Sequence, residues 1–204
     1  MTVTAVAFDF GGVLTYSAFG GLYDYEQRLS LPRGALVRHF RDGAEMARLE
    51  VGEISGREFF KHVCVTVGEE HQVRLDIREL VSAAAEGERL NPAMLELVRE
   101  VGERCPTALV TNNVAAAGWR ASFPFELFST VVDSSDVGVR KPDPAIYLEL
   151  LRRVDRTPEQ VAFVDDLDRN VDAAEALGLR PVLFTDEASC RAELIRLGAL
   201  DAGA

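Results

Sequence analysis

Four short segments of the chain each carry, after an apolar run, a side chain that phosphoryl transfer could use. The segments span 6–14, 109–113, 138–144 and 162–166. They supply a carboxylate, a hydroxyl, an ammonium group and a pair of adjacent carboxylates. If the apolar runs are parallel strands, their carboxyl ends meet at one edge of a sheet, where such folds bind ligands. We therefore expect these groups to converge on one site.

Asp9 is the first of these groups. It follows the apolar run 4–8 and precedes Gly11 and Gly12, which permit a sharp turn because neither has a Cβ atom. At the end of a central strand its carboxylate could attack phosphorus and form an aspartyl-phosphate, which splits one displacement into two steps. The alternative is an aspartate that only caps the following turn, a common role for this residue type.

Asp165 and Asp166 follow the apolar run 161–164. Two neighbouring carboxylates repel each other unless a cation joins them, and oxygen-only ligands suit Mg²⁺. The alternative is a helix cap followed by a solvated acid. With Asp9 at the same edge the metal interpretation is the better one, because a cation would shield both the attacking carboxylate and the phosphate oxygens. We therefore expect Mg²⁺ as the cofactor.

Thr111, Asn112 and Lys141 are the candidate phosphate-binding residues. Thr111 and Asn112 follow the run 108–110 and offer a hydroxyl and a backbone N–H to a phosphoryl oxygen. Lys141 lies in a loop that two prolines stiffen, just before a predicted helix. A fixed positive charge there would stabilise both the nucleophile and the transferring group. The alternative for Lys141 is an ordinary solvated loop lysine.

Apolar, partly β-branched runs alternate with helical patterns over much of the chain. The runs expected to be strands are 4–8, 108–110, 130–132, 161–164 and 181–184. This alternation predicts an α/β fold with a mainly parallel sheet that helices cover on both faces. Residues 16–90 contain helical patterns and no convincing strand. We therefore expect a helical cap at 16–90 and a catalytic core formed by 1–15 and 91–204.

The composition limits the compartment and the partners. The chain has 204 residues and a net charge of -11, which disfavours nucleic acid and anionic membranes because both select clustered Lys and Arg. No apolar run approaches the roughly 18 residues that span a bilayer, and the start lacks a basic signal-peptide segment. The three cysteines are far apart and show no metal-ligand spacing, so we expect a cytoplasmic protein with reduced thiols. The pattern does not indicate an oligomeric state.

Taken together, these segments resemble the signature of the haloacid dehalogenase-like superfamily of hydrolases. The specific parts are Gly138 to Tyr147, Phe163 to Asp166 with Asn170, and Ala176 to Gly178. Residues 48–59 are similar to the small helical cap of the branch that includes bacterial sugar-phosphate phosphatases and the phosphatase-like amino-terminal domain of soluble epoxide hydrolase. The resemblance implies a Rossmann-like three-layer core with strand order 3-2-1-4-5, a cap over the crevice, and Mg²⁺ dependence.

The resemblance also implies roles for individual residues. Asp9 would be the nucleophile and a metal ligand, and the main-chain carbonyl of Gly11 would also reach the metal. Asp166 would be the principal carboxylate of the acidic pair, and Asp165 would bind directly or through water. Phosphate would be held by Thr111, Asn112 and Lys141. Asn170 stands where many relatives carry another acid, so it would support the water shell of the metal.

Gly11 is the departure from the family pattern. Phosphatases of this superfamily usually have an aspartate two residues after the nucleophile, where it acts as general acid on the leaving alkoxide. A lost general acid typically costs about 10²–10⁴ in rate. A cap residue could supply the proton, the substrate could have a good leaving group, or the phosphatase activity could be vestigial. Candidates for a replacement acid are His39, His62, His71, Tyr16, Tyr23, Asp24 and Tyr25.

The leading hypothesis is a Mg²⁺-dependent phosphatase of a small phosphorylated metabolite. One alternative is a 2-haloacid dehalogenase, which uses the same aspartyl nucleophile and lacks an acid after it; the acidic pair argues against this, because dehalogenases need no cation. Another alternative is a catalytically weak member of the superfamily that binds a ligand and regulates. Response-regulator receivers combine similar residues, but their acidic pair follows the first strand and they have no large helical insert.

Overall fold

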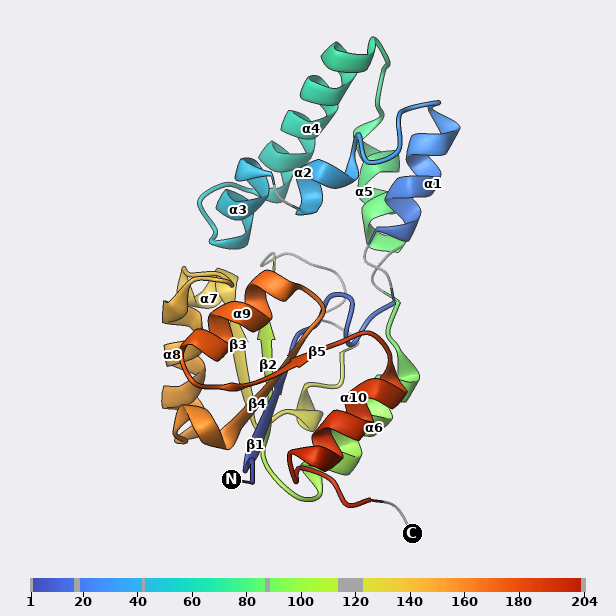
Figure 1. Cartoon of the computed structure of the whole chain (residues 1–204). Helices are drawn as coiled ribbons and strands as arrows, with labels where there is room; N and C mark the ends of the chain where they lie inside the picture. Colours follow the sequence, from blue (N-terminus) through green and yellow to red (C-terminus); the bar gives the residue numbers. More distant parts are fainter. Residues whose placement is uncertain (1, 17–18, 42, 87–88, 114–122, 203–204) are drawn as a thin grey trace.

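The central element of the molecule is a parallel sheet of five strands in the order β3-β2-β1-β4-β5 (Figure 1). The computed structural model describes residues 2–16, 19–41, 43–86, 89–113 and 123–202. The strands are β1 (Ala5–Phe8), β2 (Thr107–Thr111), β3 (Thr130–Asp133), β4 (Val161–Asp165) and β5 (Arg180–Leu183). The predicted fold class and strand order are therefore confirmed.

The central strands lie where their composition predicts, because every residue of β1, β2 and β4 is buried. A strand covered on both faces needs apolar side chains at successive positions, not only at alternate ones. Val6 and Phe8 belong to one apolar core, and Ala5 and Ala7 belong to the other. Successive side chains of a strand point to opposite faces, so one short run fills both layers.

Helices form the outer layers of the core (Figure 1). One apolar core contains residues of α6 (Pro92–Gly102) and α10 (Glu187–Arg196). The other contains residues of α8 (Pro144–Val154) and α9 (Asp168–Ala176). The short helix α7 (Ser134–Val137) follows β3, and 3-10 turns span Phe125–Leu127 and Pro158–Gln160. In α6 and α8 an Asn or Asp cap precedes a proline at the helix start, as the sequence pattern predicts.

A second group of helices lies above the carboxyl edge of the sheet (Figure 1). These helices are α1 (Gly20–Arg28), α2 (Val37–Arg41), α3 (Ala44–Glu50), α4 (Gly56–His71) and α5 (Ile77–Ala85), and they pack around a separate apolar core. We call this group the cap, and we propose that it extends over residues 16–90. No helix of the described ranges combines the length and the apolar character that crossing a bilayer requires.

The strand register brings the predicted site residues to one level. Phe8 of β1 pairs with Val164 of β4, so the next residues, Asp9 and Asp165, follow at adjacent strand ends. The Asp9 N–H donates to the Val164 carbonyl at 2.9 Å. Parallel strands that end together leave their last side chains facing the same crevice. The sheet therefore places both carboxylates beneath the cap.

Candidate active site

Asp9 is nearly buried, with 7% of its surface exposed. Burial raises the pKa of Asp9 to about 8, and the nearby carboxylates of Asp165 and Asp166 add to this rise, while the ammonium group of Lys141 opposes it. A carboxylate without water can stay charged only if cations or donors lie close to it. Asp9 therefore depends on neighbouring positive charge for its nucleophilic form.

Lys141 supplies part of that positive charge. Its side chain is 1% exposed, and its Nζ atom lies 2.5 Å from Asp9 Oδ1 and 2.7 Å from Asp165 Oδ2. The same ammonium group donates to the Val110 carbonyl at 3.0 Å. Burial alone would lower the pKa of Lys141, but the carboxylates of Asp165 and Asp9 raise it overall. All three ammonium hydrogens are thereby engaged, since lysine has three donors.

Asn112 fixes the loop that carries Lys141. The Lys141 N–H donates to Asn112 Oδ1 at 2.7 Å, and Asn112 Nδ2 donates to the Lys141 carbonyl at 3.0 Å. The peptide bond between Lys141 and Pro142 is cis. The side chain of Asn112 is thus used to hold this loop, a role that the sequence pattern did not suggest. Only its backbone N–H remains the predicted phosphate donor.

The two acidic neighbours at the end of β4 differ in their surroundings. Asp165 is fully buried, and its Oδ1 accepts hydrogen bonds from the Leu167 N–H at 3.0 Å and from Asn170 Nδ2 at 2.9 Å. Since its other oxygen is bound to Lys141, both oxygens of Asp165 already have donors. Asp166 is half-buried, and its pKa is raised to about 6 by burial and by the charge of Asp165. Asp166 is therefore the acid better placed to bind a cation.

The residues at this edge fit a divalent cation. Asp9, Asp165 and Asp166 each offer a carboxylate oxygen within 4.8 Å of the others. Lys141 supplies one positive charge against these three carboxylates, which leaves an excess of negative charge. Asn170 is 2% exposed, and its buried Oδ1 atom has no hydrogen-bond partner in the described part of the chain. Carboxylate and amide oxygens are ligands that Mg²⁺ accepts, directly or through water.

The two glycines after Asp9 shape the site in different ways. Gly12 has a φ of +82°, and a Cβ atom at this position would lie 2.3 Å from Asp166 Oδ2. A side chain at this position would therefore be strained and would displace the carboxylate of Asp166, so glycine suits it. A Cβ atom at Gly11 would meet no atom within 4 Å. Space for a side chain therefore exists where the family usually has its acid.

Thr111 and the candidate acids lie in contrasting surroundings. Thr111 ends β2 with 2% exposure, and its hydroxyl makes no hydrogen bond to any residue that the structure describes. It is thus available to a ligand. The contacts of the histidines lie within the cap: His39 with Arg38 and His62, His62 with Thr66, and His71 with Glu70.

The tyrosine candidates also have contacts outside the carboxylate cluster. Tyr16 is 50% exposed and lies under Arg89, and Tyr23 lies under Arg33. The Tyr25 hydroxyl donates to the main chain of Asp76. Asp24 is exposed. None of these contacts brings a candidate acid to Asp9.

Glu50 is a residue that the sequence reasoning missed. It is 6% exposed, and its Oε2 atom lies 2.6 Å from Arg140 Nε. Both residues lie inside the segments that carry the family resemblance, but nothing in the sequence pattern indicates that they form a pair. Burial raises the pKa of Glu50, while Arg140, Lys141 and Arg169 oppose this rise. Glu50 therefore brings a charged side chain of the cap close to the Lys141 loop.

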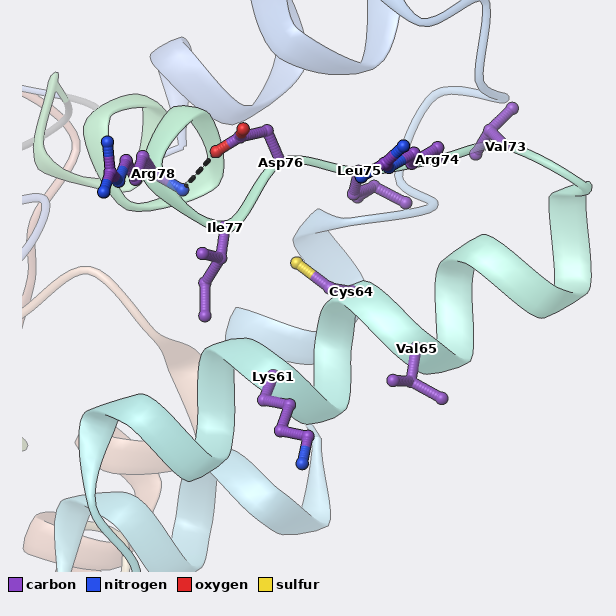
Figure 2. A pocket seen from close by; sticks show the side chains of 9 residues that line it. All are labelled: Lys61, Cys64, Val65, Val73, Arg74, Leu75, Asp76, Ile77 and Arg78. Atoms are coloured by element: carbon purple, nitrogen blue, oxygen red, sulfur yellow. Dashed lines mark hydrogen bonds between the residues drawn. The ribbon is translucent and has the colours of Figure 1, made fainter.

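A separate hollow of about 800 Å³ lies within the cap, between α4 and the segment 73–78 (Figure 2). Its lining consists of Lys61, Cys64, Val65, Val73, Arg74, Leu75, Asp76, Ile77 and Arg78. The carboxylate of Asp76 caps α5 by accepting the Arg78 N–H at 2.7 Å. This hollow contains none of the predicted site residues, so the chemistry is assigned to the sheet edge.

The fold and the site define an α/β protein with a carboxylate cluster at the carboxyl edge of its sheet and a helical cap above that edge. A family model described as haloacid dehalogenase-like hydrolase matches residues 3–178, so the chain belongs to this family.

Two curated relatives illustrate the range of the family. Bifunctional epoxide hydrolase 2 from Sus scrofa is 29% identical over 213 residues, which cover 95% of this chain and 38% of that protein. The chain therefore spans well under half the length of that relative. Glyceraldehyde 3-phosphate phosphatase from Methanopyrus kandleri is 33% identical over 92 residues, which cover 43% of this chain and 38% of that protein.

Two solved structures confirm the fold. A HAD family enzyme from Bacteroides thetaiotaomicron, in complex with magnesium and inorganic phosphate, has a TM-score of 0.66 at 18% identity and covers 90% of this chain and 94% of its own. An L-2-haloacid dehalogenase also has a TM-score of 0.66, at 22% identity, and covers 92% of this chain and 87% of its own. The fold alone therefore does not separate the two activities.

Proposed function

We propose that the chain is a Mg²⁺-dependent phosphatase that hydrolyses a small phosphorylated metabolite. The observation that carries the proposal is the contact of the Lys141 ammonium group with Asp9, beside the carboxylate of Asp166. A buried lysine at the nucleophile is suited to balance charge during phosphoryl transfer. A phosphatase among the curated relatives supports the same activity.

In the proposed reaction, an oxygen of Asp9 attacks phosphorus. The new O–P bond forms as the bond from phosphorus to the alcohol oxygen breaks, which leaves a phosphorylated Asp9. Water then attacks phosphorus, releases inorganic phosphate and regenerates the carboxylate. The Thr111 hydroxyl and the Asn112 N–H are proposed to orient the phosphoryl oxygens, and Lys141 to hold Asp9 in its charged form.

Mg²⁺ would be held by Asp9, Asp166 and the main-chain carbonyl of Gly11, with Asp165 as a further ligand, directly or through water. When bound, the ion supplies the positive charge that the three carboxylates and the phosphoryl group lack. The raised pKa values of Asp9 and Asp166 support this assignment, because a bound cation would favour the charged form of both carboxylates.

The leaving group must depart without an acid at position 11. An alkoxide needs a proton as it leaves, and general acid catalysis typically contributes about 10²–10⁴-fold. We therefore propose that the preferred substrates release a weakly basic oxygen, as aryl or acyl phosphates do. The cytoplasm is the proposed compartment, since Cys64, Cys105 and Cys190 are free thiols.

A dehalogenase remains the second candidate, because Gly11 leaves the nucleophile without an acid and because one dehalogenase shares the fold. The carboxylate cluster of Asp9, Asp165 and Asp166 favours the phosphatase, since a displacement of halide at carbon needs no cation. Incubation with 2-chloropropionate should release no chloride. Release of chloride without Mg²⁺ would replace the proposed function by the second candidate.

The direct test uses p-nitrophenyl phosphate, whose leaving group needs little protonation. Wild-type protein should release nitrophenolate only when Mg²⁺ is present, and Asp9→Asn should abolish the release. Asp172→Asn is the matched control, because Asp172 is an exposed aspartate of α9. Equal release by wild type and Asp9→Asn would contradict an aspartyl-phosphate intermediate.

A further inference from the structure

Glu50 of the cap makes two separate contacts with the core, in addition to the hydrogen bond that Arg169 Nη2 donates to the Arg41 carbonyl at 3.3 Å. The Glu50 Oε2 atom lies 2.6 Å from Arg140 Nε. The Ser134 hydroxyl donates to the Glu50 carbonyl at 2.7 Å. At the end of α3, both the side chain and the main chain of Glu50 therefore contact the segment that follows β3.

The two partners of Glu50, Arg140 and Ser134, both lie next to the hydrogen-bonded pair formed by Asn112 and Lys141. Arg140 directly precedes Lys141 in the chain. Ser134 Oγ accepts the N–H of Asn113 at 2.9 Å, and Asn113 directly follows Asn112. The Lys141 main chain is itself bonded to the Asn112 side chain. Glu50 thus contacts Arg140, the neighbour of Lys141, directly. Through Ser134 it is also connected to Asn113, the neighbour of Asn112.

The charge pair is costly in its position. The Glu50 side chain is 9% exposed, whereas Glu45 of the same helix is 29% exposed in its pair with Arg48. Removing two charges from water is expensive, and a buried ion pair often contributes little to net stability. Buried charge pairs are best attested as groups that select one arrangement over others. The pair of Glu50 and Arg140 lies between the cap and the core, where it could select one orientation of the cap over others.

Without Glu50, Arg140 would be an uncompensated guanidinium next to Lys141. The carboxylates of Asp9 and Asp166 lie at the same sheet edge and would attract it. An arginine that reached Asp9 would compete with Lys141 for the nucleophile. The pairing of Arg140 with Glu50 would prevent this competition as long as the cap is docked.

We propose that Glu50 is a positioning residue that makes the placement of Lys141 against Asp9 conditional on docking of the cap. This inference rests on the proposed phosphatase function. Glu50 acts through Arg140 and Ser134 and does not touch the substrate. We do not assign it the role of the missing proton donor, because its carboxyl group is paired with Arg140.

Glu50→Gln tests the proposal, because it removes the charge and keeps the size of the side chain. Glu45→Gln is the matched control, since Glu45 lies in the same helix and pairs with an arginine at the surface. The kcat and KM for p-nitrophenyl phosphate are measured with Mg²⁺ at a temperature well below the unfolding transition of every variant. Glu50→Gln should lower kcat by about 10–10²-fold with a smaller change in KM, since misplacing a reacting group by about 1 Å costs up to that much. Glu45→Gln should leave both constants unchanged.

Arg140→Gln and the double variant give a second measurement. If Glu50 acts through Arg140, the double variant should be no less active than the worse single variant, because coupled residues are not additive. A purely structural role of Glu50 would lower the melting temperature and leave kcat unchanged. That result, or equal kcat in Glu50→Gln and Glu45→Gln, would overturn the inference while the phosphatase function stands.

An inactive wild-type protein would instead end the proposed function. Amide hydrogen exchange then tests the placement directly. The N–H groups of Asn113 and Lys141 should exchange faster in Glu50→Gln than in Glu45→Gln, since both amides are held at this boundary. Equal exchange at both amides would overturn the inference.

Discussion

The Nζ atom of Lys141 lies 2.5 Å from the Oδ1 atom of Asp9, and both side chains are almost completely buried. An ammonium group and a carboxylate so close together in a dry environment each depend on the other for their charge. The fold itself thus places this pair of charges at the nucleophile. A substitution in this pair should therefore change both the free energy of unfolding and the catalytic activity.

Lys141→Met is expected to remove both stability and activity. Methionine fills a similar volume, so the main loss is the charge that compensates Asp9 and Asp165. Removing one partner of a buried pair typically costs about 3–5 kcal/mol. Urea unfolding at pH 8 measures the loss, and p-nitrophenyl phosphate turnover should fall below detection.

Lys61→Met is the control for this prediction, because Lys61 is an exposed lysine of the cap that lies away from the sheet edge. It should change neither the stability nor the turnover. An active, equally stable Lys141→Met protein would show that the pair with Asp9 has no role.

Asp165 and Asp166 are expected to respond differently to the same substitution. Asp165→Asn should lower stability as well as activity, because Asp165 accepts from Lys141, Leu167 and Asn170 inside the core. Asp166→Asn should leave the fold intact and weaken activation by Mg²⁺, because Asp166 is only half-buried and faces the proposed metal site. Melting curves and Mg²⁺ titrations of the two variants separate these effects. Similar losses of stability in both would contradict the division of roles.

Metal-free protein is expected to lose stability as pH rises. The folded pKa of Asp9 is about 8 and that of Asp166 is about 6, both above the value of 3.8 expected when unfolded. Between pH 3.8 and the folded pKa of each group, the folded state binds more protons than the unfolded state. The free energy of unfolding therefore falls as the pH increases over this range. Below the unfolded pKa both states are protonated, and this penalty disappears.

Mg²⁺ should reverse this loss, because it binds the deprotonated carboxylates of the folded state only. The rise in melting temperature on addition of millimolar MgCl₂ should therefore be larger at pH 8 than at pH 5. In Asp166→Asn the rise at pH 8 should shrink. An equal rise at both pH values would contradict proton-linked binding at this site.

The apolar runs 4–8 and 161–164 predicted central strands, because strands that are buried on both faces require unbroken apolar runs. The strand order was implied by the resemblance to the family. The sequence also predicted that Asp9, Lys141 and the acidic pair would converge, since parallel strands end at one edge. The central strands and this convergence depend on local patterns and on a general rule of α/β folds.

The residue pattern alone does not divide the roles within the acidic pair, and the expectation that Asp166 is the principal ligand came from the family resemblance. Asp165 and Asp166 are identical and adjacent, and only the direction of each side chain decides which one faces Lys141. The side-chain bonds of Asn112 depend on a loop far away in the chain. The contact of Glu50 with Arg140 depends on how the cap lies on the core, and no periodic pattern encodes that orientation.

Gly11→Asp is expected to restore general acid catalysis. A Cβ atom at this position meets nothing within 4 Å, and the backbone is not in the left-handed region, so an aspartate can be accommodated. Turnover of alkyl phosphates should rise by about 10²–10⁴-fold, because their leaving groups need a proton. Turnover of p-nitrophenyl phosphate should change little. A plot of log kcat/KM against the pKa of the leaving group should be steep for wild type and flatter for the variant.

Two controls make this last experiment decisive. Gly11→Asn has nearly the same size as Gly11→Asp but no acidic proton, so it should keep the steep dependence of the wild type. Gly12→Asp should be inactive, since a side chain there collides with Asp166. Equal slopes for wild type and Gly11→Asp would mean that a proton already reaches the leaving group from another residue. In that case the proposed preference for weakly basic leaving groups would be wrong, even though Asp9 could still be the nucleophile.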